Sequence, residues 1–82
     1  MRKEQVFIVC FEFVRDQLEA VGQQHFKTRE KAIERAEDIA EGYAGVGVYG
    51  VWVDDITYDA SDLVLVHVVG ETPDLEQLAA AA

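Results

Sequence analysis

Carboxylates are the side chains of this sequence that lie close enough together to support chemistry. Four of them fall in the nine-residue stretch DDITYDASD at residues 54–62. Such a stretch could bind a cation, present negative surface to a partner, or form a solvated turn. An EF-hand loop also needs a glycine at its sixth position and a glutamate at its twelfth. Frames that start at Asp54 or Asp55 have neither. We therefore predict no metal site, and the remaining metal alternative is a weak cation held by Asp55 and Asp59 across a turn.

Histidine, cysteine and serine give no firmer site. Cys10, His25 and His67 fall on three predicted strands, but they lack the paired C-x-x-C or H-x-x-x-H spacing of zinc sites. A buried, packed thiol is the more common role for a lone cysteine. Ser61 lies in no G-x-S-x-G turn, and the glycine-rich residues 45–50 are followed by no helix that could cradle a phosphate. We expect a non-enzymatic protein without a cofactor.

The first half of the chain reads as a strand pair followed by a helix. Residues 4–14 and 19–26 have strand-like patterns, and Gly22 indicates a bulge or bend in the second strand. Thr28 is a suitable N-cap, and from Arg29 onward the apolar residues recur with helical spacing. A hairpin that leads directly into one helix is therefore predicted.

The second half of the chain adds two strands. Residues 46–58 and 63–69 are rich in valine and aromatic side chains, and the turn-forming residues 59–62 separate them. Short connections favour antiparallel neighbours. The predicted fold is α+β, of order β-β-α-β-β, with a four-stranded antiparallel sheet and one helix packed on one face. Residues 1–72 form this single domain, and residues 73–82 form a short C-terminal helix or a disordered tail.

Charge is distributed unevenly along the sequence. The net charge of −9 argues against direct binding to nucleic acid or to an anionic membrane. Residues 1–35 contain seven basic and six acidic side chains, whereas residues 36–82 contain ten acids and no lysine or arginine. This asymmetry indicates that the negative charge of the surface is concentrated on residues 36–82.

Five of the acids line one face of the predicted helix. At 100° per residue they span about 100° of the helix surface and about 16 Å of its axis. Pairs of like charge four residues apart each destabilise a helix by a few tenths of a kcal/mol, so stability alone does not favour this arrangement. We predict that these acids, together with the aspartates of residues 54–62, bind a basic partner: Glu30, Glu34, Glu37, Asp38, Glu41, Asp54, Asp55, Asp59 and Asp62.

The predicted sheet has more apolar surface than one helix can cover. The strand patterns are apolar on both faces, and large exposed apolar patches usually mark interfaces. We expect the uncovered face to form a homodimer interface through Val6, Ile8, Cys10, Val48 and Trp52. The competing explanation is that the C-terminal segment of the same chain covers this face.

Cellular location follows from the cysteine content and from the start of the chain. A single cysteine, Cys10, excludes an intrachain disulfide and fits a reducing compartment. The chain begins with basic residues and an apolar run, as a signal peptide does. Because Glu12 interrupts the run and no cleavage pattern follows, we do not expect a signal peptide. No apolar stretch reaches the roughly 18 residues needed to cross a bilayer. We expect a soluble, cytoplasmic protein.

Two classes of function remain on these observations. The first is an acidic binding protein that engages a basic surface as a nucleic-acid mimic. In size, acidity and lack of catalytic signatures the chain is similar in kind to phage-encoded inhibitors such as anti-CRISPR and antirestriction proteins, a likeness that involves no motif. The alternative is a small dimeric sheet module that binds a ligand or partner through an apolar sheet face, with acidity serving solubility. An enzyme built at a dimer interface from carboxylates and His67 is a third, weaker reading.

Overall fold

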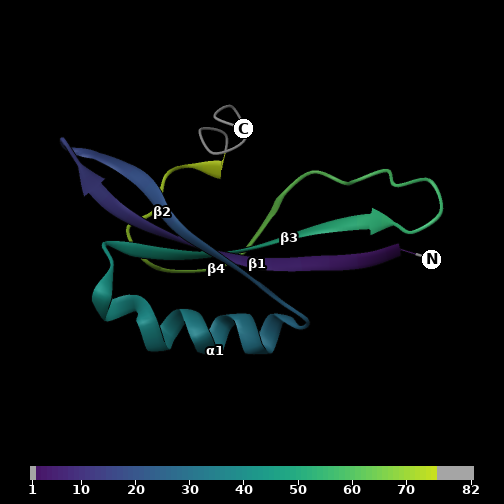
Figure 1. Ribbon diagram of the computed structural model, residues 1–82, viewed down its shortest axis with the longest axis horizontal. Coiled ribbons are helices and arrows are strands. Elements are labelled where there is room, and N and C mark those ends of the chain that lie inside the picture. The colour runs from purple at the N-terminus through teal and green to yellow at the C-terminus, as the bar shows by residue number, and fades with distance from the viewer. Residues whose placement is uncertain (1, 76–82) are drawn as a thin grey trace.

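The computed structural model describes residues 2–75, and Figure 1 shows one helix lying across a twisted sheet. In chain order the elements are β1 (Arg2–Val14), β2 (Gln17–Phe26), α1 (Arg29–Ile39), the 3₁₀ helix η1 (Ala40–Gly42), β3 (Gly45–Asp54) and β4 (Val64–Gly70). The four strands pair antiparallel in the order β2-β1-β3-β4. The predicted α+β fold of order β-β-α-β-β is therefore confirmed. Residues 76–82, which make up most of the predicted C-terminal helix or tail, lie outside the described residues.

A two-residue turn joins β1 to β2. Val14 pairs with Gln17, and the two residues between them, Arg15 and Asp16, have φ angles of 53° and 68°. Positive φ at both central positions defines a type I′ turn, whose twist matches that of the flanking strands. Asparagine followed by glycine is the usual pair in this turn, so arginine followed by aspartate is an uncommon pair for it.

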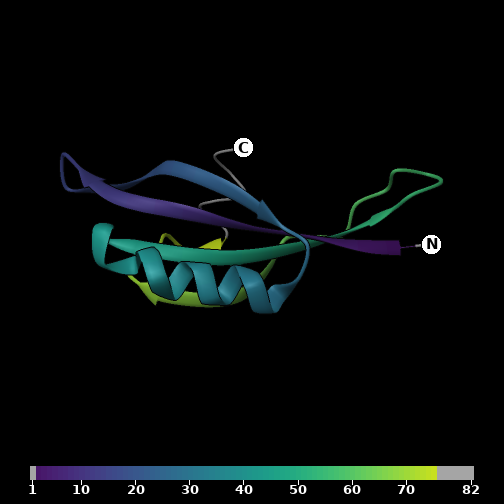
Figure 2. The ribbon, with the colours of Figure 1, turned by 60° about the horizontal axis from the view of Figure 1, so that its bottom comes forward.

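The predicted irregularity at Gly22 is a β-bulge. Cys10 pairs with Gly22 and Phe11 pairs with Ala20, which leaves Val21 without a partner across the strands. A bulge bends the strand and increases its local twist. In Figure 2 the β1–β2 hairpin accordingly rises away from α1 toward its turn.

Helix α1 starts at the predicted cap and is tied to the sheet at its first turn. The Thr28 hydroxyl accepts a hydrogen bond from the Lys31 backbone N–H at 3.2 Å. Arg29, the first residue of the helix, donates from Nε to Glu4 Oε1 on β1 at 2.7 Å, and its second amino group pairs with the other carboxylate oxygen. The cap and this ion pair fix which side of α1 faces the sheet.

Two apolar clusters lie on opposite faces of the sheet. The cluster under α1 contains Val6, Ile8, Cys10, Ala32, Ala36, Val46 and Val48. The cluster on the other face contains Val9, Phe11 and Tyr49, against which Phe7, Leu18, Leu63 and Leu75 pack. Residues of the C-terminal third thus cover the face that α1 leaves open.

The predicted dimer interface was assigned to the wrong face. Val6, Ile8, Cys10 and Val48 lie under α1, and each is at most 5% exposed; only Trp52, at 40%, is exposed. Periodicity separates the two faces of a strand, but it does not show which of them the helix covers. Leu63 and Leu75 pack against the second face, as the competing explanation expects, and a homodimer stays a prediction.

Tyr49 is the centre of this second cluster. Its ring stacks on Phe7 with centroids 5.8 Å apart, and it lies so close to Gly47 that a Cβ there would meet ring atoms at 2.6 Å. Burial raises the pKa of the Tyr49 hydroxyl, and the nearby Thr72 side chain opposes that rise. Within residues 2–75 no group bonds this hydroxyl with good geometry, Thr72 included. Because a Cβ at residue 47 would overlap the Tyr49 ring, packing requires glycine at this position.

Candidate functional site

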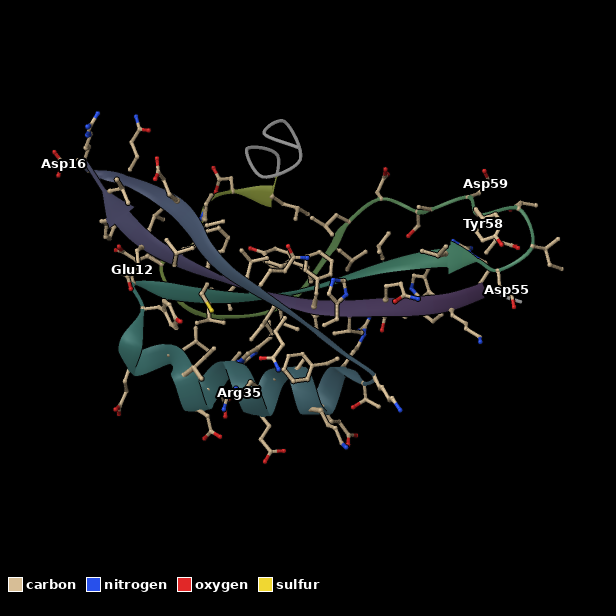
Figure 3. All side chains as sticks on the ribbon, in the orientation of Figure 1. Glu12, Asp16, Arg35, Asp55, Tyr58 and Asp59 are labelled. Atoms are coloured by element: carbon tan, nitrogen blue, oxygen red, sulfur yellow. The ribbon has the colours of Figure 1, made fainter. Side chains whose placement is uncertain are left out.

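The five acids predicted on the helix form an exposed surface, which we name the helix stripe: Glu30, Glu34, Glu37, Asp38 and Glu41. All five are exposed, while Ala32 and Ala36 on the opposite side of α1 are buried against the sheet. Figure 3 shows carboxylate groups projecting from the side of α1 that faces away from the strands. The structure therefore brings these acids together as the sequence predicts.

The helix stripe keeps most of its negative charge. Within residues 2–75 the one ion pair that reaches it joins Glu37 Oε1 to His67 Nε2 at 3.5 Å, and this pair carries charge on both sides only when His67 is protonated. Lys31 and Arg35 stand three residues before Glu34 and Asp38, a spacing at which opposite charges on a helix can pair. Among the described residues neither cation lies within ion-pair distance of those acids.

The aspartates of residues 54–62, which we name the aspartate loop, do not all have the same role. Strand β3 ends at Asp54, four residues before the predicted end, because the Asp54 carboxylate accepts the backbone N–H groups of Ile56 at 2.8 Å and Thr57 at 3.2 Å. These two hydrogen bonds lower the pKa of the Asp54 carboxyl. The Tyr58 N–H also bonds the Asp54 carbonyl at 2.8 Å. Asp54 is thus a turn-forming residue.

The remaining loop acids, Asp55, Asp59 and Asp62, are exposed. The loop closes back onto β3 through an isolated bridge between Val53 and Ala60 and through the Ser61 hydroxyl, which accepts the Trp52 N–H at 2.9 Å. The loop is therefore held in a defined shape, and its three outer carboxylates lie at its surface.

Sequence reasoning missed the two most exposed apolar residues of this loop. Ile56 and Tyr58 are 78% and 80% exposed, and Tyr58 has a φ of 61°. Both had been placed in a strand that runs to residue 58. The signal that could have corrected this is the aspartate two residues before Ile56, since aspartate commonly bonds the backbone two residues on and starts a turn.

The helix stripe and the aspartate loop do not form one continuous surface. In Figure 1 the loop extends past the N-terminal end of α1 and lies on the other side of the sheet, and Figure 2 shows the same separation. The sequence alone does not fix whether the helix acids and the loop acids lie on the same side, because that depends on strand order. The chain presents two separate acidic surfaces.

Metal-ligating residues do not gather in the part of the chain that the structure covers. Residues 2–75 contain no group of three histidine, cysteine or acidic side chains that could hold an ion. Cys10 lies under α1, whereas the ring of His25 packs near Phe7 on the opposite face, with centroids 5.7 Å apart. The conceivable zinc site of Cys10, His25 and His67 cannot form across the sheet.

Comparisons with protein-family models, with curated proteins and with solved structures found no match to this chain. Within residues 2–75, no helix has the length and apolar character needed to cross a membrane. Function must therefore be argued from the surfaces themselves.

Proposed function

We propose that this chain is a non-enzymatic binding protein whose helix stripe engages a basic surface of a partner protein. The observation that carries the proposal is a row of five exposed carboxylates, four on α1 and Glu41 just beyond it in η1, of which only Glu37 has an ion-pair partner within the described residues. Like charges at this spacing weaken an isolated helix. A binding role gives a reason for their presence that helix stability does not.

The spacing of the stripe favours a site that normally holds nucleic acid. The five acids cover about 16 Å of axis in four intervals, which is an average of about 4 Å between neighbouring charges. A single strand of B-DNA carries one phosphate per about 3.4 Å of its axis. We therefore propose a nucleic-acid mimic that occupies the basic groove of a nucleic-acid enzyme, as anti-CRISPR and antirestriction inhibitors do.

The aspartate loop supplies a second contact in this proposal. The exposed Tyr58 lies in the same loop as the exposed Asp55, Asp59 and Asp62, and tyrosine is among the residues that contribute most to binding energy at interfaces. Because the loop lies on the other side of the sheet from α1, a partner that touches both must wrap one end of the molecule. The alternative function, binding through an apolar sheet face, has less support, since other parts of the chain pack against the apolar clusters of both faces.

Three immobilised proteins test the proposal in one host extract. They are the wild type, the stripe variant Glu34→Lys/Asp38→Lys/Glu41→Lys, and the control Glu12→Lys/Glu19→Lys/Glu71→Lys, which has the same net charge as the stripe variant. A partner that fits is retained by the wild type and the control, is lost from the stripe variant, and is displaced by its own nucleic acid. Its retention falls between about 0.1 M and about 1 M salt, where the screening length drops from about 10 Å to about 3 Å. Equal retention on all three proteins contradicts the proposal.

A further inference from the structure

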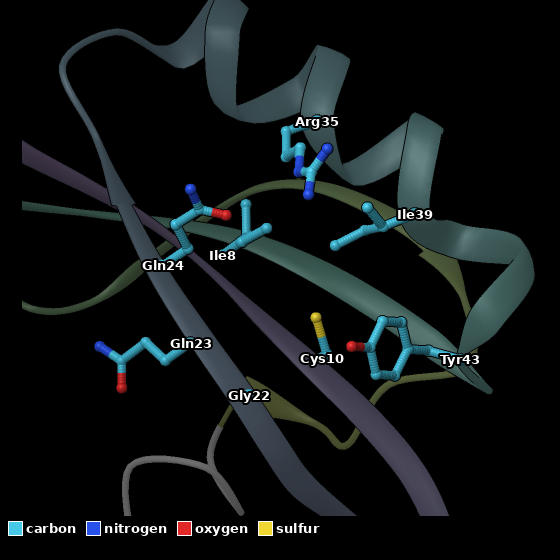
Figure 4. A pocket seen from close by; sticks show the side chains of 8 residues that line it. All are labelled: Ile8, Cys10, Gly22, Gln23, Gln24, Arg35, Ile39 and Tyr43. Atoms are coloured by element: carbon cyan, nitrogen blue, oxygen red, sulfur yellow. The ribbon is translucent and has the colours of Figure 1, made fainter.

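A pocket of about 200 Å³ opens between the β1–β2 hairpin and α1. Figure 4 shows its walls, which come from β1, β2, α1 and the segment that follows η1. Two glutamines of β2 line it together with Ile8, Cys10, Gly22, Arg35, Ile39 and Tyr43. None of these residues belongs to the helix stripe or to the aspartate loop.

The bulge at Gly22 is what creates this space. The hairpin bends away from α1 at the bulge, so β2 is not covered by the helix as β1 and β3 are (Figure 2). Gly22 faces the Cys10 side chain and has no side chain of its own to fill the gap. Bulges recur next to functional sites because they re-aim neighbouring side chains.

The pocket has one fully charged group, and it is positive. The Arg35 guanidinium lies over the pocket in Figure 4, and it has no ion-pair partner among residues 2–75. Ile8 and Ile39 supply an apolar part of the wall, beside the polar side chains of Gln23, Gln24 and Tyr43. An unpaired arginine above an apolar wall is complementary to an anion that carries an apolar body.

The thiol in this pocket adds no competing negative charge. Burial raises the pKa of Cys10, although the Tyr43 hydroxyl and the Arg35 charge oppose the rise. In Figure 4 the Tyr43 hydroxyl points toward the Cys10 sulfur. Cys10 therefore contributes a neutral, polarisable wall, and Tyr43 can hydrogen-bond a ligand oxygen.

We infer that this pocket binds a small monocarboxylate with an apolar body. The carboxylate pairs with the planar guanidinium of Arg35, and the apolar body lies on Ile8 and Ile39. The small volume limits the ligand to a short-chain or single-ring acid. This site is independent of the proposed partner-binding function, because it uses other residues and needs no second protein.

NMR titration tests the inference with benzoate and hexanoate as probes, against benzamide and hexanamide as neutral analogues of the same shape. We expect saturable shifts of the Gln23 and Gln24 amides with the acids, at a dissociation constant of about 1 mM, which is typical of a few good contacts in a small site. The amides should bind at least about tenfold more weakly, because they cannot pair with the guanidinium.

Three variants identify the site. Arg35→Gln removes the cation, and Gly22→Val fills the space, since a Cβ at Gly22 meets only Cys10 atoms at 3.8 and 4.0 Å. Lys31→Gln, one turn earlier on α1, removes the same charge outside the pocket. Loss of binding in the first two with wild-type binding in the third supports the inference. It is overturned if all three bind alike, if the amides bind as well as the acids, or if neither acid saturates. Arg35 is exposed, so its variant decides the matter even if Gly22→Val fails to fold.

Discussion

Arg29 and Glu4 join the first turn of α1 to the N-terminal strand through two parallel hydrogen bonds. The Glu4 side chain is 13% exposed, and its position over Gly50 leaves it few other partners. The hydrogen bonds from Arg29 lower the pKa of the Glu4 carboxyl, which burial partly opposes. Such paired, planar geometry is the strongest form of carboxylate–arginine contact.

This ion pair should make stability depend on pH at the acidic end. Because the folded pKa of Glu4 lies below its unfolded value, the pair stabilises the fold above that unfolded value and loses its effect as pH falls through the folded pKa. We expect Glu4→Gln to lower the midpoint of urea unfolding at pH 7 and to leave it nearly unchanged at pH 2. An equal loss at both pH values would show that the side chain acts through packing alone.

The β1–β2 turn should be improvable by residues that prefer its backbone. Arg15 and Asp16 both have positive φ, which disfavours residues other than glycine and asparagine. We expect Arg15→Asn/Asp16→Gly to raise the free energy of unfolding by about 1 kcal/mol. Asp16→Ala serves as control, because alanine keeps the unfavourable conformation. A double variant no more stable than the wild type would contradict the I′ assignment.

Gly47 should tolerate no side chain while Tyr49 is present. A Cβ at Gly47 would overlap the Tyr49 ring, which is 1% exposed and cannot move aside. We expect Gly47→Ala to destabilise the protein by about 1–3 kcal/mol, the usual range for overpacking. Gly42→Ala is the matched control, since a Cβ there has no neighbour within 4 Å. Adding Tyr49→Leu to Gly47→Ala should restore part of the lost stability. If it restores none, the destabilisation does not come from contact with the Tyr49 ring.

The stripe variant proposed above should fold at least as well as the wild type. Replacing Glu34, Asp38 and Glu41 with lysine turns the like-charge pairs 30/34 and 37/41 into opposite-charge pairs, although positions 34 and 38 still carry like charges. It also places cations near the C-terminal end of α1, where the dipole favours them. We expect thermal unfolding to shift upward by an amount equivalent to a few tenths of a kcal/mol per removed pair. A lower melting temperature would mean that these acids stabilise the fold, which removes the main reason to assign them to a partner.

Local signals predicted most of the fold. The cap of α1 is a hydrogen bond between Thr28 and Lys31, which are three residues apart. The bulge at Gly22 likewise depends on a residue within the strand itself. The helix stripe follows from helical spacing alone. These features could be read from the sequence because each depends on residues close together in the chain.

The features that sequence analysis missed depend on long-range packing. Which sheet face α1 covers is decided by contacts such as Arg29 to Glu4, which are 25 residues apart. The early end of β3 is the exception, because Asp54 captures backbone N–H groups only two and three residues further on, so a local signal was present and was missed. The Arg35 pocket depends on how far the hairpin bends at its bulge, which no residue pattern specifies.

Coverage of the second sheet face by residues 63–75 gives the end of the chain a protective role. All four strands are complete at Gly70, so a protease that cuts just after that residue would leave the sheet intact. The clipped molecule would lose Leu75 and the neighbouring Thr72 from above Tyr49. Its newly bared surface would include Phe11 and Tyr49, which are each 1% exposed in the intact fold.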